Sequence, residues 1–321
     1  MVCRLQGRLG RGGWTLMAWQ LPPDDDIRAF LGTSPPAPDW VIEGIEPGDV
    51  GILSAPGGTG KSMFCLSLGA SVAGGQPLFG VWQVGNPGDV LYIYAEDKPS
   101  TIHRRLKALH QVSPLDASAI DRVHTVCVRS VPPKLMVRGE DRSGIARPQN
   151  PELAEIMSRV KRYPNPRLII IDPLIKFHAL DENVNTEMEQ FLTLMTKMAE
   201  ELGVAIILTH HVGKSAVLNG QSSTQQSARG ASAIVDQARW QVALSTLDEK
   251  YAKKIGIPAD DAWKYLNATN PKINGAGRLD DLLLERGPDG VLMRSGLTPT
   301  VNPTKPHRRV VSIDDYMEED Q

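Results

Sequence analysis

Cysteine is scarce in this 321-residue sequence, which contains only Cys3, Cys65 and Cys127. The three are isolated from one another, odd in number and without Cys or His neighbours at metal-ligand spacing. This pattern excludes a disulfide framework and a structural zinc site, and it predicts a reducing compartment, the cytoplasm. Long apolar runs are also missing, since none approaches the ~20 residues that a membrane-spanning helix needs. We therefore expect no membrane partner.

Net positive charge is missing as well, since 35 Lys and Arg residues stand against 37 Asp and Glu residues, for a net charge of −2. This balance excludes a uniformly basic nucleic-acid-binding protein, so any contact with DNA must come from local basic patches. Aromatic residues make up only 5% of the chain, which disfavours a surface covered with base-stacking side chains.

The two ends of the chain differ in composition from its middle. The first part contains a second methionine, Met17, and a stiff Pro-rich connector. Met17 is either the true start of the protein or part of an ordinary disordered terminus. The other end runs from basic to acidic, a charge-segregated pattern typical of disorder. Length alone suggests about two domains. Composition instead predicts three segments: a flexible N-terminal segment and connector over residues 1–38, one folded core over residues 39–298 and a disordered charged tail over residues 299–321.

Strand and helix patterns alternate within the core, which predicts a parallel sheet built from βαβ units. The predicted strands cover residues 50–54, 90–94, 168–171 and 204–209, and the predicted helices cover residues 62–73, 101–110, 150–163 and 186–202. Thr186 and Glu189 are spaced as a capping box at the start of the last helix. After Arg239 the pattern predicts antiparallel strands over residues 240–247, 263–268, 279–285 and 290–294. The expected fold class is α/β, with a mostly parallel central sheet, helices on both faces and antiparallel strands added at the C-terminal end.

The strongest motif is Ala-Pro-Gly-Gly-Thr-Gly-Lys-Ser over residues 55–62, a P-loop with Ala55 in place of the first glycine. Its glycines (Gly57, Gly58, Gly60) let backbone N–H groups turn inward around phosphate oxygens. Lys61 is expected to contact the β- and γ-phosphates, and the Ser62 hydroxyl to bind Mg²⁺. The alternative is a chance Gly-rich turn, but the motif lies between a predicted strand and a predicted helix, the context that a P-loop requires.

Two acids follow predicted strands directly. Glu96 lies just after the strand over residues 90–94, and Asp172 just after the strand over residues 168–171. In an open parallel sheet the ligand binds outside the carboxyl ends of the strands, so both acids are expected to face the phosphates. Asp172 suits a Walker-B acid that holds Mg²⁺, and Glu96 suits the base that orients the attacking water. The alternative for either acid is an ordinary surface or helix-capping position.

His210 and His211 follow the strand over residues 204–209. Adjacent residues of an extended chain point in opposite directions, so only one of the two can face the nucleotide. A hydrogen-bonded core histidine is the alternative. The polar segment that follows, with Lys214 as its first charge, suits a DNA-contacting loop or an ordinary mobile loop. Arg229 and Arg239 beyond it are candidate arginine fingers acting on a neighbouring subunit, or surface salt-bridge partners.

Taken together, these blocks resemble the RepA-like hexameric replicative DNA helicases of plasmids, which are RecA-core ATPases of the DnaB-type group. The resemblance covers most of the core from about Ile27 to Leu292 and is most specific in Gln225-Gln226-Ser227-Ala228-Arg229-Gly230, which leads to Arg239-Trp240. It departs at both ends of the chain, which have no clear counterpart, and no primase-like segment is fused to the core.

The resemblance implies a RecA-like fold, ATP and Mg²⁺ as cofactors, and a homo-oligomer, a hexameric ring, around single-stranded DNA. A primase or an initiator protein is a further candidate partner. The implied catalytic groups are Glu96, His211 as γ-phosphate sensor and Arg239 as arginine finger, ahead of Arg229. Lys272 matches a basic position that RecA-core ATPases can use across the subunit interface. The implied nucleotide-binding residues are Gly57, Gly58, Thr59, Gly60, Lys61, Ser62 and Met63, with Ser62 and Asp172 as the Mg²⁺ ligands.

Two other functions share this core. A RecA-type recombination or repair ATPase would form filaments and need a polymerisation segment, which residues 1–40 do not show. A non-motor replication regulator switched by ATP could dispense with Glu96 and Arg239, and their presence argues against it. The predicted function is therefore an ATP-dependent replicative DNA helicase.

Overall fold

The structure is a computed structural model that describes residues 23–139, 146–211, 234, 237–247, 249–273 and 279–297. Met17 and the predicted tail over residues 299–321 lie outside these ranges, and the predicted three-segment division remains a prediction. No helix in the described ranges is long and apolar enough to cross a membrane.

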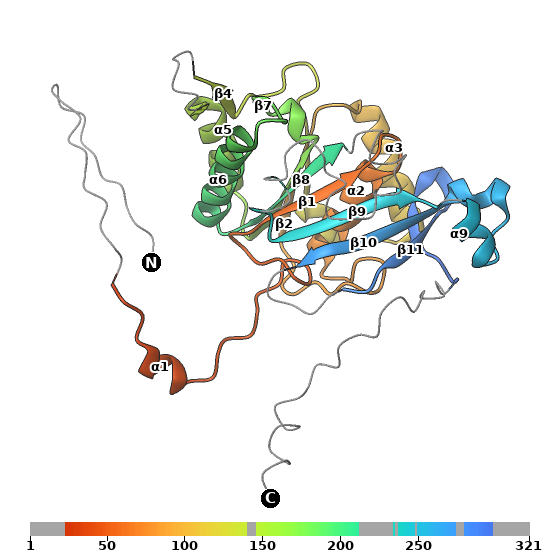
Figure 1. The fold of residues 1–321 in the computed structure, drawn as a ribbon, viewed down its shortest axis with the longest axis horizontal. Helices are drawn as coiled ribbons and strands as arrows, with labels where there is room; N and C mark the ends of the chain where they lie inside the picture. The colour runs from red at the N-terminus through yellow and green to blue at the C-terminus, as the bar shows by residue number, and fades with distance from the viewer. Residues whose placement is uncertain are drawn as a thin grey trace, which may run out of the picture.

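A nine-stranded sheet, counted over the described residues, forms the centre of the fold (Figure 1). Its strand order is β12-β11-β10-β9-β1-β8-β6-β2-β3. The strands are β1 (Val50–Ala55), β2 (Asp89–Tyr94), β3 (Val123–Cys127), β6 (Pro166–Asp172), β8 (Ala205–His211), β9 (Trp240–Thr246), β10 (Tyr265–Ile273), β11 (Leu282–Arg286) and β12 (Leu292–Arg294). The six strands from β9 to β3 in this order run parallel, so their carboxyl ends lie at one side. We call the side with Ala55, Tyr94, Asp172 and His211 the carboxyl edge, and the side with Val50, Asp89, Ala205 and Trp240 the amino edge.

The expected fold class agrees with this architecture, with one correction. The sequence pattern predicted an antiparallel strand from Trp240 onward, but β9 pairs with β1 in parallel, with Trp240 opposite Gly51. Antiparallel pairing begins only with β10 and continues through β11 and β12. The prediction was wrong because an apolar run has the same side-chain period in either strand direction, and direction depends on where the preceding segment brings the chain.

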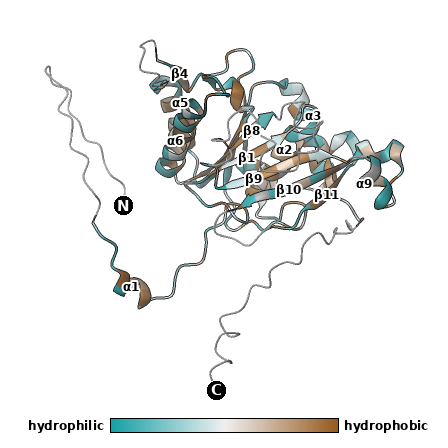
Figure 2. Cartoon of the chain, viewed as in Figure 1, coloured by the Kyte–Doolittle hydropathy of each residue, from teal (hydrophilic) through white to brown (hydrophobic). Residues whose placement is uncertain are grey.

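Helices cover both faces of the sheet, as expected (Figure 1). Side chains alternate along β1: Leu53 belongs to the apolar cluster under α2, whereas Ile52 belongs to the cluster under α6. Apolar residues are concentrated in the strands and on the helix faces turned toward them (Figure 2). One face carries α2 (Lys61–Gly74), α3 (Pro99–Val112) and α4 (Ala117–Arg122), and the other carries α5 (Asn150–Val160) and α6 (Asn185–Leu202).

The start of α6 differs from the predicted capping box. Val184 is the N-cap residue, Thr186 lies inside the helix, and no side chain caps the first turn from the N-cap position. Instead the Glu187 carboxylate reaches back and accepts a hydrogen bond of 2.8 Å from the backbone N–H of Asp181. Gly203 ends the helix in the left-handed conformation, with φ of 63°, as its position predicted.

A small second sheet follows the carboxyl end of β6 and was not expected from the sequence. It consists of β4 (Met136–Arg138), β5 (Ala146–Pro148) and β7 (His178–Ala179), in the order β5-β4-β7. Strands of two or three residues are too short to show a period in the sequence. The sheet fixes the segment that leaves Asp172, including η1 (Leu174–Lys176).

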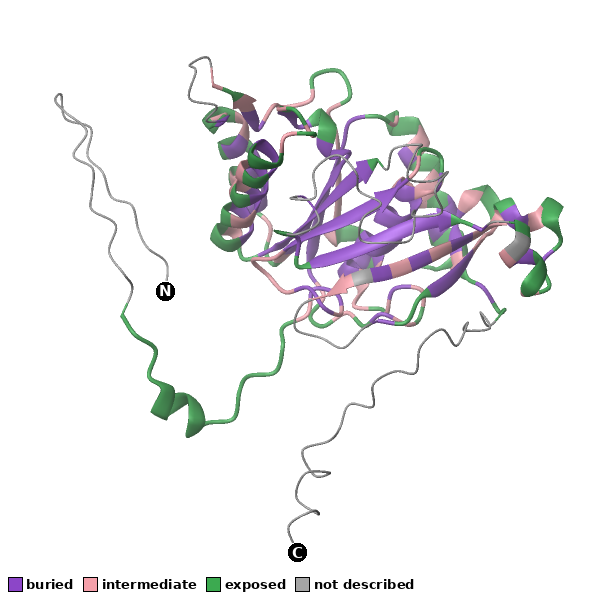
Figure 3. Ribbon diagram, viewed as in Figure 1, coloured by how far each residue is buried: buried purple, intermediate pink, exposed green. Residues whose placement is uncertain are grey.

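The packed part of the chain begins near Asp39. Before it, α1 (Ile27–Leu31) buries none of its residues, and Leu31 is 84% exposed (Figure 3). The buried Arg167 donates two hydrogen bonds of 2.7 Å to the Asp39 carboxylate, which fastens the end of the connector to β6.

Three short helical elements accompany the C-terminal strands. α9 (Glu249–Lys254) and η3 (Ala259–Lys264) bury Leu247 and Leu283 in a separate apolar cluster. η4 (Pro288–Gly290) forms the turn between β11 and β12.

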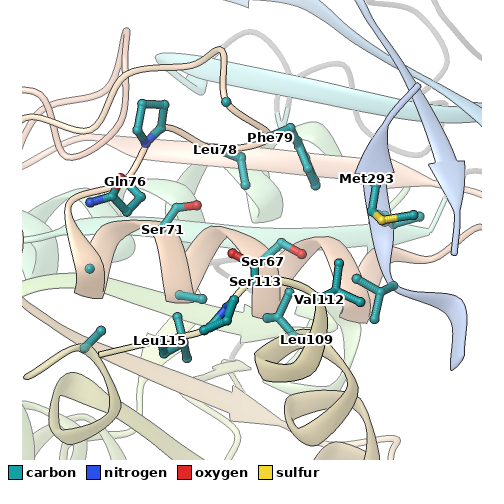
Figure 4. A pocket seen from close by; sticks show the side chains of 18 of the residues that line it. Ser67, Ser71, Gln76, Leu78, Phe79, Leu109, Val112, Ser113, Leu115 and Met293 are labelled. Carbon is teal, nitrogen blue, oxygen red and sulfur yellow. The ribbon is translucent and has the colours of Figure 1, made fainter. Parts of the chain in front are cut away.

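A cavity of about 510 Å³ lies along α2, between this helix, the end of α3 and β12. Figure 4 shows Ser67 and Ser71 of α2 near Leu109, Val112 and Met293. None of the predicted site residues lines this cavity, which is therefore separate from the P-loop at the start of α2.

Candidate nucleotide-binding site

The predicted P-loop joins β1 to α2 at the carboxyl edge. Gly58 and Gly60 have φ angles of 75° and 111°, a left-handed backbone that side chains rarely adopt. A Cβ atom added at Gly57 or Gly58 would meet no other atom within 4 Å, so this side of the loop is open to a ligand. The loop and the first turn of α2 together offer backbone N–H groups and the positive end of a helix dipole, which suits a phosphate.

Two further members of the predicted loop have structural roles. The Thr59 side chain is buried and donates a hydrogen bond of 2.9 Å to the carbonyl of Pro56, which closes the loop. Met63 is 3% exposed and packs in the apolar cluster under α2. Only its backbone can therefore contact a nucleotide.

Lys61 lies at the centre of the site and is only 6% exposed. Its Nζ donates to the carbonyls of Ala55 (3.0 Å) and Pro56 (3.2 Å) and lies 3.1 Å from His211 Nδ1. Burial lowers the pKa of Lys61, and the charge of Asp172 opposes the shift. Because an ammonium can only donate, Nδ1 of His211 accepts, and the ring proton of the neutral histidine is on Nε2.

Asp172, the last residue of β6, is buried and accepts three hydrogen bonds. Thr209 donates to Oδ1 at 2.6 Å, while Tyr92 at 2.6 Å and Ser62 at 3.1 Å donate to Oδ2. Burial, followed by the charge of Asp172, raises the pKa of Tyr92 well above its usual value, so its hydroxyl remains a donor. The two predicted Mg²⁺ ligands, Ser62 and Asp172, are thus within hydrogen-bond distance of each other.

Glu96 and His211 complete the cluster. His211 Nε2 lies 3.6 Å from Glu96 Oε2, and the Glu96 side chain is 50% exposed. His210 lies on the other face of the sheet, where it is buried beside Glu182, and burial lowers its pKa. Only one histidine of the pair faces the P-loop, as strand alternation predicted. The structure therefore brings together the predicted residues of four segments at the carboxyl edge.

The predicted trans-acting residues lie at the other side of the sheet. Arg239 is exposed and precedes β9, where its backbone N–H donates to the carbonyl of Val50 at 2.9 Å. Lys272 on β10 is paired with Gln241 and so lies at the same amino edge. From there to Ala55 the chain spans the length of β1, about 17 Å at ~3.3 Å per residue. Lys214 and Arg229 lie outside the described residues.

Three residues that touch this site were missed by the sequence analysis. Tyr92 and Thr209 hold Asp172, and Arg286 at the end of β11 donates to the carbonyl of Thr59 at 2.7 Å. Strand alternation could have indicated Thr209, which precedes His211 by two residues on the same face. Nothing in the sequence indicates Arg286.

A parallel sheet with a P-loop after its central strand, and with acids after the neighbouring strands, defines a RecA-like P-loop ATPase. Residues 19–217 match the AAA domain family. The match spans more than half of the chain, and the chain belongs to the AAA domain family. The solved ATPase domain of a RecA-like helicase is similar in fold, with a TM-score of 0.52 and 13% sequence identity over 78% of this chain and 86% of that chain.

Proposed function

We propose that this chain is an ATP-dependent replicative DNA helicase of the RepA-like type, a hexameric ring that translocates on single-stranded DNA and unwinds duplex DNA. One observation carries the proposal: Lys61, Ser62, Asp172, Glu96 and His211 lie together at the carboxyl edge. This is the set of groups that ATP binding and hydrolysis require, in a protein whose fold is also that of an ATPase domain.

The P-loop and Lys61 would bind the phosphates of ATP, and Ser62 with Asp172 would hold Mg²⁺. The described residues contain no group of three or more His, Cys, Asp and Glu side chains suited to a metal. This donor set fits Mg²⁺, because that ion is usually held by one or two carboxylates together with phosphates and water. When bound, Mg²⁺ neutralises charge on the phosphates.

Glu96 is the proposed base. Its exposed carboxylate can accept a proton from a water molecule near the γ-phosphate, while Nε2–H of His211 faces it from the opposite direction. A γ-phosphate would compete with His211 for the Lys61 ammonium, which now bonds Nδ1 of that ring. His211 would thereby respond to the presence of the γ-phosphate, and it lies at the end of β8, directly before the proposed DNA-contacting loop with Lys214.

Arg239 and Lys272 are proposed to act on the nucleotide of a neighbouring subunit. Both lie at the amino edge, too far from the P-loop of their own chain for direct contact. A ring that apposes the amino edge of one subunit to the carboxyl edge of the next would complete each site. Arg229 is the weaker candidate for the same role. A primase or an initiator protein remains a proposed partner for loading.

The test is ATP hydrolysis by the full chain, with and without single-stranded DNA, together with unwinding of a forked duplex. DNA-stimulated hydrolysis and strand displacement, both lost in Lys61→Ala, are expected. Electron microscopy in the presence of ATP and single-stranded DNA should show closed rings. Filaments would favour a recombination ATPase, and ATP binding without hydrolysis would favour an ATP-switched regulator.

A further inference from the structure

Arg286 joins the P-loop to the C-terminal strands. Its Nη2 donates to the carbonyl of Thr59 at 2.7 Å and lies 3.5 Å from the carbonyl of Gly58. Its Nε donates to the carbonyl of Trp263 at 3.2 Å. One guanidinium therefore connects the phosphate-binding loop with the segment that enters β10.

The charge of Arg286 has no carboxylate partner among the described ion pairs. The side chain is nevertheless about half-buried, and burial lowers its pKa. A half-buried guanidinium that is satisfied by backbone carbonyls leaves a net positive charge beside the P-loop. Such a charge favours an anion nearby more than it favours the protein without one.

The bond to Thr59 also controls a peptide group. In a trans peptide the C=O of Thr59 and the N–H of Gly60 point in opposite directions. Holding this carbonyl on the Arg286 side directs the Gly60 N–H to the other side. The fit is close, because a Cβ atom added at Gly60 would lie 3.3 Å from Nη1 of Arg286. Glycine is thus required here for contact with the guanidinium as well as for its φ of 111°.

We infer that Arg286 is a positioning residue of the nucleotide site, which orients the Gly60 peptide and adds positive charge for the phosphates of ATP. The inference rests on the proposed ATP binding at the P-loop. It also extends the site to β11, so that the antiparallel strands of the C-terminal end take part in binding.

The experiment measures the dissociation constant of Mg-ATP and the unfolding midpoint without nucleotide for the full chain. The variants are Arg286→Ala and Arg286→Lys, with Arg294→Ala as control. Arg294 is an exposed arginine on the adjacent strand β12, and its removal changes the charge equally. We expect about tenfold weaker ATP binding for Arg286→Ala, since a lost hydrogen bond to a charged group has roughly that effect. Arg286→Lys should recover part of the affinity, because lysine keeps the charge without the fork. Arg294→Ala should match the wild type.

A merely structural role would lower the unfolding midpoint and leave the dissociation constant within twofold of the wild type, and this result would overturn the inference. If Arg286→Ala does not fold, Arg286→Lys decides: weaker binding supports the inference, and unchanged binding overturns it. Failure of the wild-type chain itself to bind Mg-ATP would instead overturn the proposed function, and the inference with it.

Discussion

Tyr92→Phe tests how the candidate Mg²⁺ ligand is held. The substitution removes one oxygen atom and keeps a ring that is 2% exposed and packed against Tyr94. The lost hydroxyl donates to Oδ2 of Asp172 at 2.6 Å. Because the pKa of Tyr92 is raised well above its usual value, the hydroxyl is protonated throughout the range in which the protein can be studied.

The expected cost follows from the charge of the acceptor. A buried hydrogen bond to an ionised group contributes about 1.5–3 kcal/mol, roughly twice the value for a neutral pair. Asp172 keeps its bonds from Thr209 and Ser62, so part of the desolvation is still compensated. We therefore expect Tyr92→Phe to lower the free energy of unfolding by about 2 kcal/mol.

Urea unfolding without nucleotide, at one protein concentration for all variants, measures this change. Tyr94→Phe is the matched control, because this tyrosine lies two residues away on the same strand and the same face. Burial raises the pKa of Tyr94 to about 12, and its hydroxyl faces the Cys127 thiol rather than a carboxylate. Its loss should therefore cost at most about 1 kcal/mol. Equal losses for the two variants, or less than about 0.5 kcal/mol for Tyr92→Phe, would refute the assigned hydrogen bond.

Three further predictions concern the site and the connector. Glu96→Gln should reduce ATP turnover by at least ~100-fold and change the ATP dissociation constant little; normal turnover would exclude Glu96 as base. Arg239→Ala should reduce turnover by ~1,000-fold with ATP binding retained, and mixing it with Lys61→Ala subunits should restore part of the activity, whereas inactive mixtures would argue against action in trans. Asp39→Asn should lower stability at pH 7 by about 1 kcal/mol, given that the Asp39 side chain is half-exposed. The hydrogen bond from Arg167 lowers the pKa of Asp39 below 3.8, so this difference should disappear as the pH falls through that range; a constant difference in urea unfolding down to pH 2 would contradict it.

The arrangement around the P-loop could be predicted because its information is local. The loop is contiguous in sequence, and Glu96 and Asp172 directly follow apolar runs whose carboxyl ends a parallel sheet gathers at one edge. The partners of Asp172 could not be predicted in the same way. Tyr92 and Thr209 lie 80 and 37 residues from it, and only the strand order β2-β6-β8 brings them together.

Other errors came from tertiary contacts that replaced a local preference. Thr186 and Glu189 have the spacing of a capping box, but the helix begins earlier because Glu187 bonds both Arg138 and the N–H of Asp181. Arg286 lies 227 residues from Thr59, and it reaches the P-loop only because β11 runs antiparallel to β10 and ends at the carboxyl edge. Strand direction, which the apolar pattern does not encode, thus determines which residues reach the site.

The two edges of the sheet also bear on why a single subunit would be a poor ATPase. One chain supplies Lys61 and Arg286 at its P-loop, but Lys61 is bound by two carbonyls and His211, and Arg286 by backbone oxygens. Both are fixed by the ground state of the protein, and neither is free to follow charge that develops during hydrolysis. The exposed Arg239 is free to do so, but it lies a strand length away from its own P-loop. Transition-state stabilisation by this arginine therefore requires a second copy, which makes assembly a condition of turnover in the proposed mechanism.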